Sequence, residues 1–375
     1  MRTVDAAGLE IGDDHPPRVM GVLNVSEESP YDPSVYDDPA EAAAYVDEDL
    51  IGEGADIVDV GLESANKKFD VLSAEGELDR LETAVQTIES VSGDAVFSIE
   101  TRYHEVAEEA LDRGFDMVND ICGFADPEMP RVCEEYDVAV GKMASPPDLE
   151  RPGAIEDVDE IYDALFRNGV TEKTIVDPAF GGWSEEKTTD DDRETFRRLR
   201  EFRAVGQPIL VSINRKNFLR ELAGRSTDES LPVSLAATAM AVERGAHVVR
   251  THDVKETVDA ALVGDAFARE RVRNPETGVE ELDVTAVGEA RRQFEAVDGD
   301  ADPGRAVARS FTLALPAESR ERLRTAAEGH DVVVTGTGDR VVLAGTVAAL
   351  RSLADSVTEP PALVAALDRV REASR

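Results

Sequence analysis

Short apolar runs recur along the first 255 residues of the chain, and nearly every run ends at a polar residue. Amphipathic stretches of helical length separate the runs, so strand-like and helix-like patterns alternate eight times. This alternation predicts an α/β protein built on a parallel (β/α)8 barrel, also called a TIM barrel. The strands are expected at residues 19–24, 57–61, 95–100, 117–121, 138–142, 174–177, 209–214 and 248–250.

The helices of the predicted barrel have residues typical of helix ends. Pro39 suits the first turn of the first helix, and Gly54 suits the position just after its end. Long polar connections follow strands one, two, six and seven, and loops at this end of a barrel carry the active site. The sixth connection holds the only tryptophan, Trp183. The helices are expected at residues 39–53, 78–91, 104–113, 126–136, 157–168, 190–204, 233–244 and 254–269.

Sequence patterns outside the barrel predict smaller pieces at both ends of the chain. Residues 1–17 are expected to form a hairpin that closes the bottom of the barrel, and the barrel itself is expected at 18–273. Residues 274–304 contain one helical stretch and a linker rich in glycine and aspartate. Residues 305–375 predict a small α/β module with no motif that indicates chemistry, which favours an interface or stabilising role. Its strands are expected at 310–315, 332–335 and 341–343, with a helix at 318–328 and two more at the end.

The charge of the chain is strongly acidic, with 79 acidic and 40 basic residues and a formal net charge of −39. A domain with this charge repels itself at low salt, whereas at molar salt the Debye length shrinks to about 3 Å. The composition therefore predicts a halophilic protein adapted to a salty cytoplasm. No basic stretch is visible, which weighs against nucleic acid as a partner.

The apolar runs and the cysteines predict a cytoplasmic protein. No run reaches the length of about 18 apolar residues that a transmembrane helix needs, and the first residues lack the apolar core of a signal peptide. Cys122 and Cys133 have no metal-binding spacing, and a structural disulfide is unusual in a reducing compartment. Both are expected to be small buried apolar residues.

Two cationic clusters follow the last two predicted strands. Arg215 and Lys216 come after strand seven, and Arg250 and His252 come at the end of strand eight. Phosphate groups are commonly bound at this corner of a barrel, so the clusters predict an anion site. The alternative for Arg215 is a purely structural ion pair with Asp253.

Polar side chains at the ends of other strands suit a heterocyclic ligand. Glu100 and Asp177 end strands three and six, and Asn119 lies on strand four. Ionised carboxylates only accept hydrogen bonds and an amide both donates and accepts, so the three suit a flat heterocycle with several N–H donors. The alternative is a carboxylate network that ties loops together, because buried acids need partners. Asn24, at the end of strand one, is a candidate ligand for a hard cation or a phosphate oxygen. Lysine is scarce in this chain, and a functional role is therefore also considered for Lys142, which ends strand five.

Together these motifs resemble those of dihydropteroate synthases in order and spacing, over roughly residues 19–267. Each motif is short and weak alone, but the set is specific. It consists of MGVLNVS at 20–26, GADIVDVG at 54–61 followed by Glu63 and Ser64, SIET at 98–101, VNDI at 118–121, VDP at 176–178, NRK at 214–216 and RTHDV at 250–254.

The resemblance implies a transferase of folate-type or methanopterin-type biosynthesis. In this family the amine of p-aminobenzoate attacks the methylene of a dihydropterin diphosphate and releases pyrophosphate. The resemblance implies that Asp177 and Asn119 hold the pterin edge, helped by Glu100 and Lys216.

The same resemblance implies a diphosphate site and a quaternary structure. Arg250, His252 and Asn24 with Mg²⁺ would hold the diphosphate, and Asn24 would be the metal ligand. Lys216, Arg250 and His252 would be the catalytic residues, because fixed cations stabilise the charge that builds on a departing diphosphate. A homodimer is also implied.

Several motifs depart from the family pattern. The first loop reads SEESP at 26–30 where the family has TPDSF, and the second reads ANKK at 65–68 where the family has TRPG. Lys67 or Lys68 is therefore a candidate to replace the family's arginine. Further departures are Glu100 in place of aspartate, Asn214 in place of serine, VGKM at 140–143 in place of a histidine motif, and AFGGW at 179–183 in place of a glycine-rich turn.

The motifs that match the family predict that the pterin and diphosphate sites are retained. The changed loops predict a different arylamine site, for example one for a ribosylated arylamine. Two other hypotheses remain. A methyltetrahydrofolate-type methyltransferase would need a pterin site but no diphosphate site, so Arg250 and His252 argue against it. A non-catalytic pterin-binding or regulatory protein would keep the pterin site and lack turnover.

Overall fold

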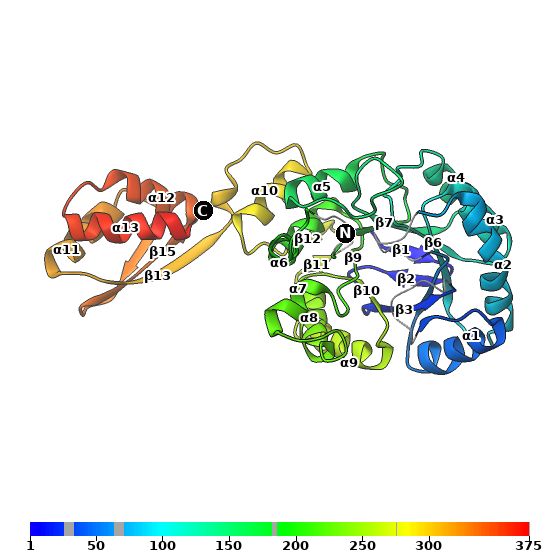
Figure 1. Cartoon of the computed structure of the whole chain (residues 1–375). Helices are drawn as coiled ribbons and strands as arrows, with labels where there is room; N and C mark the ends of the chain where they lie inside the picture. Colours follow the sequence, from blue (N-terminus) through cyan, green and yellow to red (C-terminus); the bar gives the residue numbers. More distant parts are fainter. Residues whose placement is uncertain (26–33, 64–70, 182–185, 275, 375) are drawn as a thin grey trace. The chain divides into compact units, whose positions relative to one another are not determined.

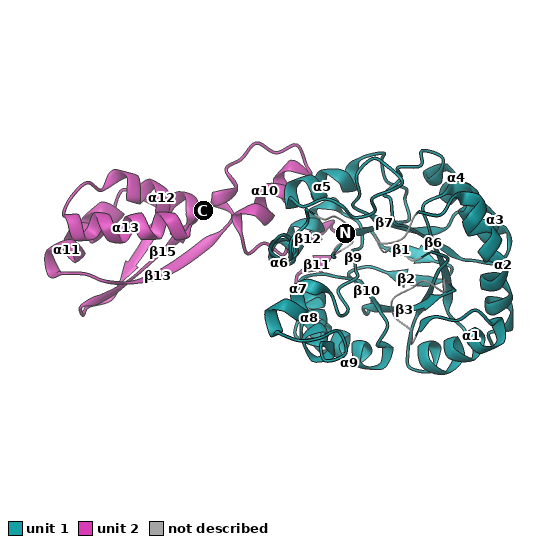
Figure 2. Ribbon diagram, viewed as in Figure 1, with its two compact units in different colours: residues 1–270 teal, residues 271–375 magenta. Residues whose placement is uncertain are grey.

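The computed structural model describes residues 1–25, 34–63, 71–181, 186–274 and 276–374. The chain divides into two compact units, Met1–Glu270 and Arg271–Arg375, shown in two colours in Figure 2.

The first unit is a closed barrel of eight parallel strands surrounded by helices (Figure 1). The strands pair in the order β8-β7-β6-β5-β4-β3-β10-β9, and a bridge between Val176 and Ile209 joins the two ends of the sheet. This architecture confirms the predicted (β/α)8 barrel. The strands are β3 (Arg18–Asn24), β4 (Ile57–Gly61), β5 (Val96–Thr101), β6 (Met117–Asp120), β7 (Ala139–Met143), β8 (Thr174–Asp177), β9 (Leu210–Val211) and β10 (Val248–Thr251).

The helices of the first unit follow the predicted order with shifted ends. Several end earlier than expected, and two continue in a different helical form. They are α1 (Pro39–Tyr45), continued by the π-helix η2 (Val46–Ile51), α2 (Ala74–Ser90), α3 (His104–Asp112), α4 (Met129–Glu135), α5 (Val158–Phe166), α6 (Thr189–Arg197), continued by the 3₁₀-helix η3 (Leu199–Val205), α7 (Asn217–Ala223), α8 (Leu231–Glu243) and α9 (Val254–Ala266).

The connection after β9 contains a helix that the sequence pattern did not predict. Helix α7 buries Phe218 and Leu219 and ends at Gly224, which adopts the left-handed conformation that favours glycine at helix ends. Two buried residues over seven positions give too little periodicity to separate a short helix from a loop. The long connection predicted after strand seven is therefore partly helical, which the sequence analysis did not anticipate.

The amino-terminal end of the barrel is filled by apolar side chains. An antiparallel hairpin of β1 (Val4–Ala6) and β2 (Leu9–Ile11) packs there. Its side chains share one core cluster with a first inward layer contributed by every barrel strand. Because side chains alternate along a strand, the residues two and four positions beyond that layer also point inward. The layer is Met20, Ile57, Val96, Met117, Ala139, Ile175, Leu210 and Val248.

The two cysteines are buried among the apolar residues of the barrel unit, as predicted. Cys122 and Cys133 are each 1% exposed, and neither forms a disulfide. Burial raises the pKa of both thiols, that of Cys133 to about 12. Among the described residues, no helix has the length and apolar character needed to cross a membrane.

The second unit has its own core on one face of a small antiparallel sheet. Strands β13 (Ala308–Ala314), β15 (Arg340–Thr346) and β14 (Val332–Thr335) pair in that order, and Leu343 of the middle strand is fully buried. Leucines of three helices, α11 (Ala317–Ala327), α12 (Val347–Ser356) and α13 (Pro361–Ala373), complete this core. The segment before the sheet contains β11 (Arg273–Asn274), β12 (Val279–Glu280), α10 (Val287–Glu295) and the 3₁₀-helix η4 (Pro303–Arg305).

Candidate functional site

The second inward layer of the barrel is polar, and Asp59 lies at its centre. Asp59 is fully buried on β4, two residues beyond the apolar Ile57. Its carboxylate accepts hydrogen bonds from Ser98 Oγ at 2.8 Å, Asn119 Nδ2 at 3.0 Å and Arg250 Nε at 2.6 Å. These partners come from β5, β6 and β10, so one carboxylate joins strands on both sides of the barrel.

Arg250 connects this layer to Glu100. Its Nη2 donates to Glu100 Oε2 at 2.7 Å while its Nε is held by Asp59. Burial opposes the charge on the guanidinium, but Glu100 and Asp59 together keep the pKa of Arg250 above its ordinary value. Burial also raises the pKa of Glu100, and Arg250 partly offsets that effect. A fixed cation therefore faces the barrel mouth between two carboxylates.

Asp177 lies at the carboxyl end of β8, with a cationic side chain beside its loop. It is 5% exposed, and its Oδ1 accepts the backbone N–H of Ala179 at 2.8 Å. Burial raises the pKa of Asp177 to about 6, whereas the Ala179 N–H and the positive charge of Lys216 act in the opposite direction.

The Lys216 side chain packs against Gly181, which lies in the loop after β8. Gly181 has φ +123°, and a Cβ there would lie 2.9 Å from Lys216 Nζ. Only glycine combines this backbone conformation with the space that the lysine needs. Burial, together with nearby Arg250, lowers the pKa of the Lys216 ammonium.

Lys187 is a residue of this region that sequence reasoning missed. Its ammonium is buried, donates to the Ala179 carbonyl at 2.5 Å and pairs with Asp192 Oδ1 at 3.4 Å. Because the Ala179 N–H in turn binds Asp177, Lys187 holds the turn that presents Asp177. The scarcity of lysine in the chain was the one available signal.

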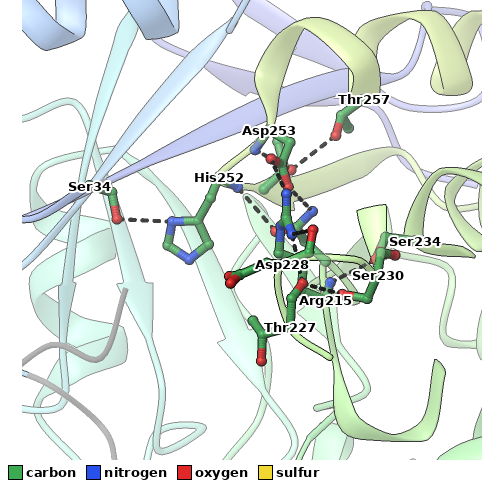
Figure 3. Close-up of polar contacts among 11 residues, drawn as sticks. Ser34, Arg215, Thr227, Asp228, Ser230, Ser234, His252, Asp253 and Thr257 are labelled. Carbon is green, nitrogen blue, oxygen red and sulfur yellow. Dashed lines mark hydrogen bonds and ion pairs between the residues drawn. The ribbon is translucent and has the colours of Figure 1, made fainter. Parts of the chain in front are cut away.

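At the rim of the barrel mouth, Ser34 contacts residues at the ends of both β3 and β10, and Figure 3 shows its contact with His252. Asn24 Nδ2 donates to Ser34 Oγ at 3.1 Å, and the same oxygen lies 3.0 Å from His252 Nδ1. Burial lowers the pKa of His252 to about 3, and neighbouring Arg250 acts in the same direction. His252 is therefore neutral at pH 7.

Arg215 and Asp253 form the structural ion pair that was the alternative to a ligand-binding role (Figure 3). Arg215 Nε and Nη2 each bind one carboxylate oxygen of Asp253 at 2.8 Å. Arg215 Nη1 donates to the carbonyls of Thr227 and Asp228, and Asn214 Nδ2 donates to Asp253 at 2.9 Å. The pair therefore ties the loop after α7 to the end of β10.

Lys142 points away from the barrel mouth, although it is close to the end of a strand. It follows inward-facing Gly141 by one position, so its side chain leaves the barrel on the other face. The buried ammonium donates to the carbonyls of Leu165, Arg167 and Gly169 at 3.1, 2.6 and 2.6 Å. Lys142 thus caps the end of α5, and its interpretation as a site residue was wrong.

The base of the second loop is held by Glu63. Its carboxylate accepts the backbone N–H of Leu72 at 2.8 Å and pairs with the buried Arg102 at 2.6 Å. Arg102 also donates to the Leu149 carbonyl at 2.7 Å, which links this loop to the one after β7. The departures at 26–30 and 65–68, including Lys67 and Lys68, lie outside the described residues, as does Trp183.

Asn24 offers one oxygen to a metal ion, which fits a hard cation whose other ligands come mainly from a bound substrate. Its Nδ2 is used by Ser34, so one neutral oxygen remains, and Mg²⁺ commonly combines one or two protein oxygens with substrate phosphates. Among the described residues, one group of three potential metal-ligating side chains comes together elsewhere: His104, Glu105 and Asp126. Asp126 there accepts the backbone N–H of His104 at 3.0 Å, which accounts for that arrangement as a helix cap.

The fold and the site define a (β/α)8 barrel whose mouth combines acceptors for a heterocycle with cationic and polar groups for an anion. The family model described as pterin binding enzyme matches residues 20–252. The chain belongs to this pterin-binding family.

Similarity to individual proteins agrees with this assignment. Over 260 residues, the chain is 36% identical to a probable bifunctional folylpolyglutamate synthase/dihydropteroate synthase of Halobacterium salinarum; the match covers 66% of this chain and 31% of that protein. It is 31% identical to the dihydropteroate synthase of Bacillus subtilis, covering 66% of this chain and 88% of that protein. The dihydropteroate synthase of Coxiella burnetii, solved with pteroic acid, superposes with a TM-score of 0.60 at 28% identity, covering 70% of this chain and 98% of that one. The chain thus spans about a third of the halophile relative's length.

Proposed function

We propose that this protein is a transferase of the dihydropteroate synthase type, which condenses a dihydropterin diphosphate with p-aminobenzoate or a related arylamine and releases pyrophosphate. The observation that carries the proposal is the fixed guanidinium of Arg250, which Asp59 and Glu100 hold at 2.6 and 2.7 Å and whose charge acts on nearby His252. Similarity to the B. subtilis enzyme over most of that protein's length supports the same activity.

In the proposed complex, the pterin occupies the polar inner layer. Asp177 and Asn119 accept hydrogen bonds from its N–H groups, and Glu100 assists. Lys216 contributes a donor from the other side of the ring. The Asn119 amide is already oriented, because its nitrogen donates to Asp59 and its oxygen is left for a ligand.

The diphosphate occupies the rim. Arg250 and His252 bind its oxygens from β10, and Asn24 binds Mg²⁺ from β3. When bound, Mg²⁺ supplies positive charge that neutralises the leaving diphosphate. Arg250 is preorganised for this role because two carboxylates fix its guanidinium before any ligand arrives.

The reaction is a substitution at the pterin methylene carbon. The bond between this carbon and the diphosphate oxygen breaks, and the oxygen keeps the electron pair. The neutral amine forms the new C–N bond and then releases one proton to solvent. Arg250 and Lys216 stabilise the departing charge, and the buried ring supports positive charge on the methylene. A homodimer and a salty cytoplasmic setting belong to the same proposal.

Pyrophosphate release tests the proposal directly. The protein is incubated in high salt with dihydropterin diphosphate and Mg²⁺, and p-aminobenzoate and its ribosylated derivative are offered in turn. Release that depends on one of these amines is expected. Arg250→Lys, which keeps the charge but loses the two-point contact, should reduce release, and Arg322→Lys, on the exposed face of α11, is the matched control.

Two outcomes would replace the proposal. Pterin binding without pyrophosphate release for either amine would favour a non-catalytic pterin-binding protein. Transfer of a methyl group from methyltetrahydrofolate would favour the methyltransferase hypothesis.

A further inference from the structure

Strand β13 of the second unit is an outer strand of its sheet and pairs with β15 on one side (Figure 1). It is seven residues long and contains no proline, lysine or acidic residue. Native proteins commonly protect the edge of a sheet with such residues or with a short strand, because unpaired backbone groups bind other strands. The opposite outer strand, β14, has only four residues. β13 therefore lacks the features that keep an edge strand from pairing.

The register of β13 against β15 shows which of its backbone groups point to the outer edge. In an antiparallel pair, opposite residues alternate between two that exchange both hydrogen bonds and two that exchange none. The Val347 N–H donates to the Val307 carbonyl at 2.8 Å. The Leu315 N–H donates to the Asp339 carbonyl at 3.3 Å, so the bonded pairs fall at odd-numbered residues on the β13 side. The even-numbered residues therefore direct their N–H and C=O groups away from β15.

Most of these outward groups have no protein partner in the part of the chain that the structure describes. The Ala308 carbonyl accepts a hydrogen bond from Arg309 Nη1 at 3.2 Å. Among the described residues, no hydrogen bond reaches the outward backbone groups of Ser310, Thr312 and Ala314. Such groups bind either water or another strand. The edge thus offers a row of alternating donors and acceptors.

The spacing of the outward groups suits a second copy of the same strand. In an antiparallel arrangement about a twofold axis through Phe311, Ser310 lies opposite Thr312 of the second copy, and Ala308 lies opposite Ala314. Every outward N–H then meets an outward carbonyl. A shift of the register by two residues leaves an outward residue unpaired at one end, so the arrangement centred on Phe311 makes the most hydrogen bonds.

The charge of this region also favours a second copy. Two chains with a net charge of −39 repel each other, but β13 carries no carboxylate. Its one charged residue, Arg309, would lie opposite the uncharged Leu313 of the second copy. Residues 305–375 hold ten arginines and nine acidic residues, so this part of the chain is nearly neutral. Two copies can therefore approach here without bringing carboxylates together.

Phe311 lies at the centre of the matched register. Its ring packs against the core of the second unit but remains partly exposed. Directly opposite residues on one face of an antiparallel pair have Cβ atoms about 4.5–5.5 Å apart, so the two phenylalanines would meet across the axis. Aromatic side chains at the centre of an interface commonly contribute much of its affinity.

We propose that two copies of this protein associate through β13, which pairs antiparallel with its own copy and joins two three-stranded sheets into one continuous sheet. This inference does not rest on the transferase activity. The strand lies beyond residues 20–252, which match the family model, so the contact is separate from any contact between barrels. A strand of a different protein is the alternative occupant of the edge.

Disulfide cross-linking of the purified full chain tests both the contact and its register. Phe311→Cys places two cysteines opposite each other with Cα atoms about 4.5 Å apart, within the range of about 4.4–6.8 Å that a disulfide allows. Ser310→Cys is the matched control, because the two copies of position 310 would be diagonal neighbours about 7–8 Å apart. Oxidation in high salt should convert most of the Phe311→Cys chains to covalent dimers. Most of the Ser310→Cys and wild-type chains should stay single.

Blocking the edge is the second test, made in the Phe311→Cys protein. Thr312→Pro removes an outward N–H and no bond to β15, a position where an edge strand tolerates proline. It should lower the rate of cross-linking about tenfold or more, because each copy loses a hydrogen bond to the other. Thr312→Val keeps the N–H and should cross-link normally. Circular dichroism and urea unfolding check that both variants are folded.

Each outcome of these tests decides the proposal. Equal cross-linking at positions 310 and 311, or none at 311, would overturn it even where Thr312→Pro fails to fold. Unchanged cross-linking in a folded Thr312→Pro variant would overturn it as well. A wild-type chain that sediments as a monomer in high salt would also do so, and would leave the edge to a strand of another protein. Normal cross-linking without transferase activity would sink the proposed function and leave this inference intact.

Discussion

Arg250 is the residue on which the inner layer of the barrel depends. A buried guanidinium needs partners, and Asp59 and Glu100 supply them at 2.6 and 2.7 Å. Removing one member of such a group leaves the others with buried charge, which is commonly costly. The layer therefore holds its geometry as a unit, and single changes in it will affect both stability and binding.

Lys216 is the best position to separate binding from stability. Its side chain lies at the barrel mouth against Gly181 and adds little to the apolar core. Lys216→Ala should weaken binding of dihydropterin diphosphate about 10- to 100-fold, the range for losing a hydrogen bond to a charged group. Isothermal titration calorimetry in high salt measures the affinity, and urea unfolding checks that stability is nearly unchanged.

Lys255→Ala, at an exposed position in the first turn of α9, is the matched control and should bind normally. Equal affinity in the wild type and Lys216→Ala would show that the lysine does not contact the pterin.

The carboxyl of Asp177 should make pterin binding depend on pH. Its pKa is raised to about 6 by burial, and only the ionised form accepts hydrogen bonds with both oxygens. Affinity for a pterin without phosphate should therefore fall as the pH drops below about 6, by up to tenfold per unit. Fluorescence titration between pH 5 and 8 measures this fall.

Asp177→Asn should bind more weakly and lose most of the pH dependence in this window. A wild-type affinity that is constant from pH 5 to 8 would contradict the role given to Asp177.

The ionisation of Asp177 affects stability in the opposite direction from binding: as the pH rises, pterin affinity increases and the contribution of Asp177 to folding stability decreases. A raised folded pKa favours the folded state at low pH, and this contribution is lost as the pH rises from about 4 through about 6. Hydrogen-bond donors from a ligand would offset the loss.

At the scale of elements, the sequence predicted which strands form the barrel and in what order, because apolar runs and helical stretches alternate clearly. It predicted that Glu100, Asn119 and Asp177 face inward, but it did not separate all inward-facing polar residues from outward-facing ones. Asp59 and Lys142 both end or interrupt apolar runs, but Asp59 is two positions beyond a first-layer residue and Lys142 is three. Because alternate residues of a strand face the same side, an even number of positions from the first inward layer predicts an inward side chain and an odd number an outward one.

Other parts of the site depend on contacts between distant segments. Ser34 is 218 positions from His252 in sequence, and nothing in its local pattern indicates that partner. Arg215 and Asp253 were recognised as a possible ion pair, but their two-point geometry required the fold. The motif resemblance helped because it carries such long-range information in its order and spacing.

The cap on α5 gives a prediction for an element. Lys142→Met leaves the carbonyls of Leu165, Arg167 and Gly169 without this donor, so the free energy of unfolding should fall by about 1–3 kcal/mol. Pterin affinity should stay unchanged, because the side chain leaves the barrel on its outer face. Urea denaturation and calorimetric binding measure the two effects.

Lys173→Met is a suitable comparison, since this lysine pairs with the exposed Asp137 and should contribute less than 1 kcal/mol. A large loss of pterin affinity in Lys142→Met would return Lys142 to the candidate site.

At the scale of the whole molecule, the net charge of −39 gives a prediction about salt. Most acidic residues gain little from isolated surface ion pairs, whereas their mutual repulsion acts throughout each unit. The urea midpoint of unfolding should rise as KCl increases from 0.1 to 2 M, because the Debye length falls from about 10 Å to below about 3 Å. Because urea is uncharged, the denaturant does not change the ionic strength, which is set by KCl alone. A midpoint that stays constant or falls would argue against adaptation to salt.

The burial of both cysteines has a practical consequence for labelling. Thiol-reactive dyes attack the thiolate, and the native thiols combine 1% exposure with raised pKa values. We expect neither to react appreciably with a maleimide at neutral pH. One cysteine introduced at an exposed position of either unit would then carry a fluorophore or spin label at that site alone, in an otherwise unaltered chain.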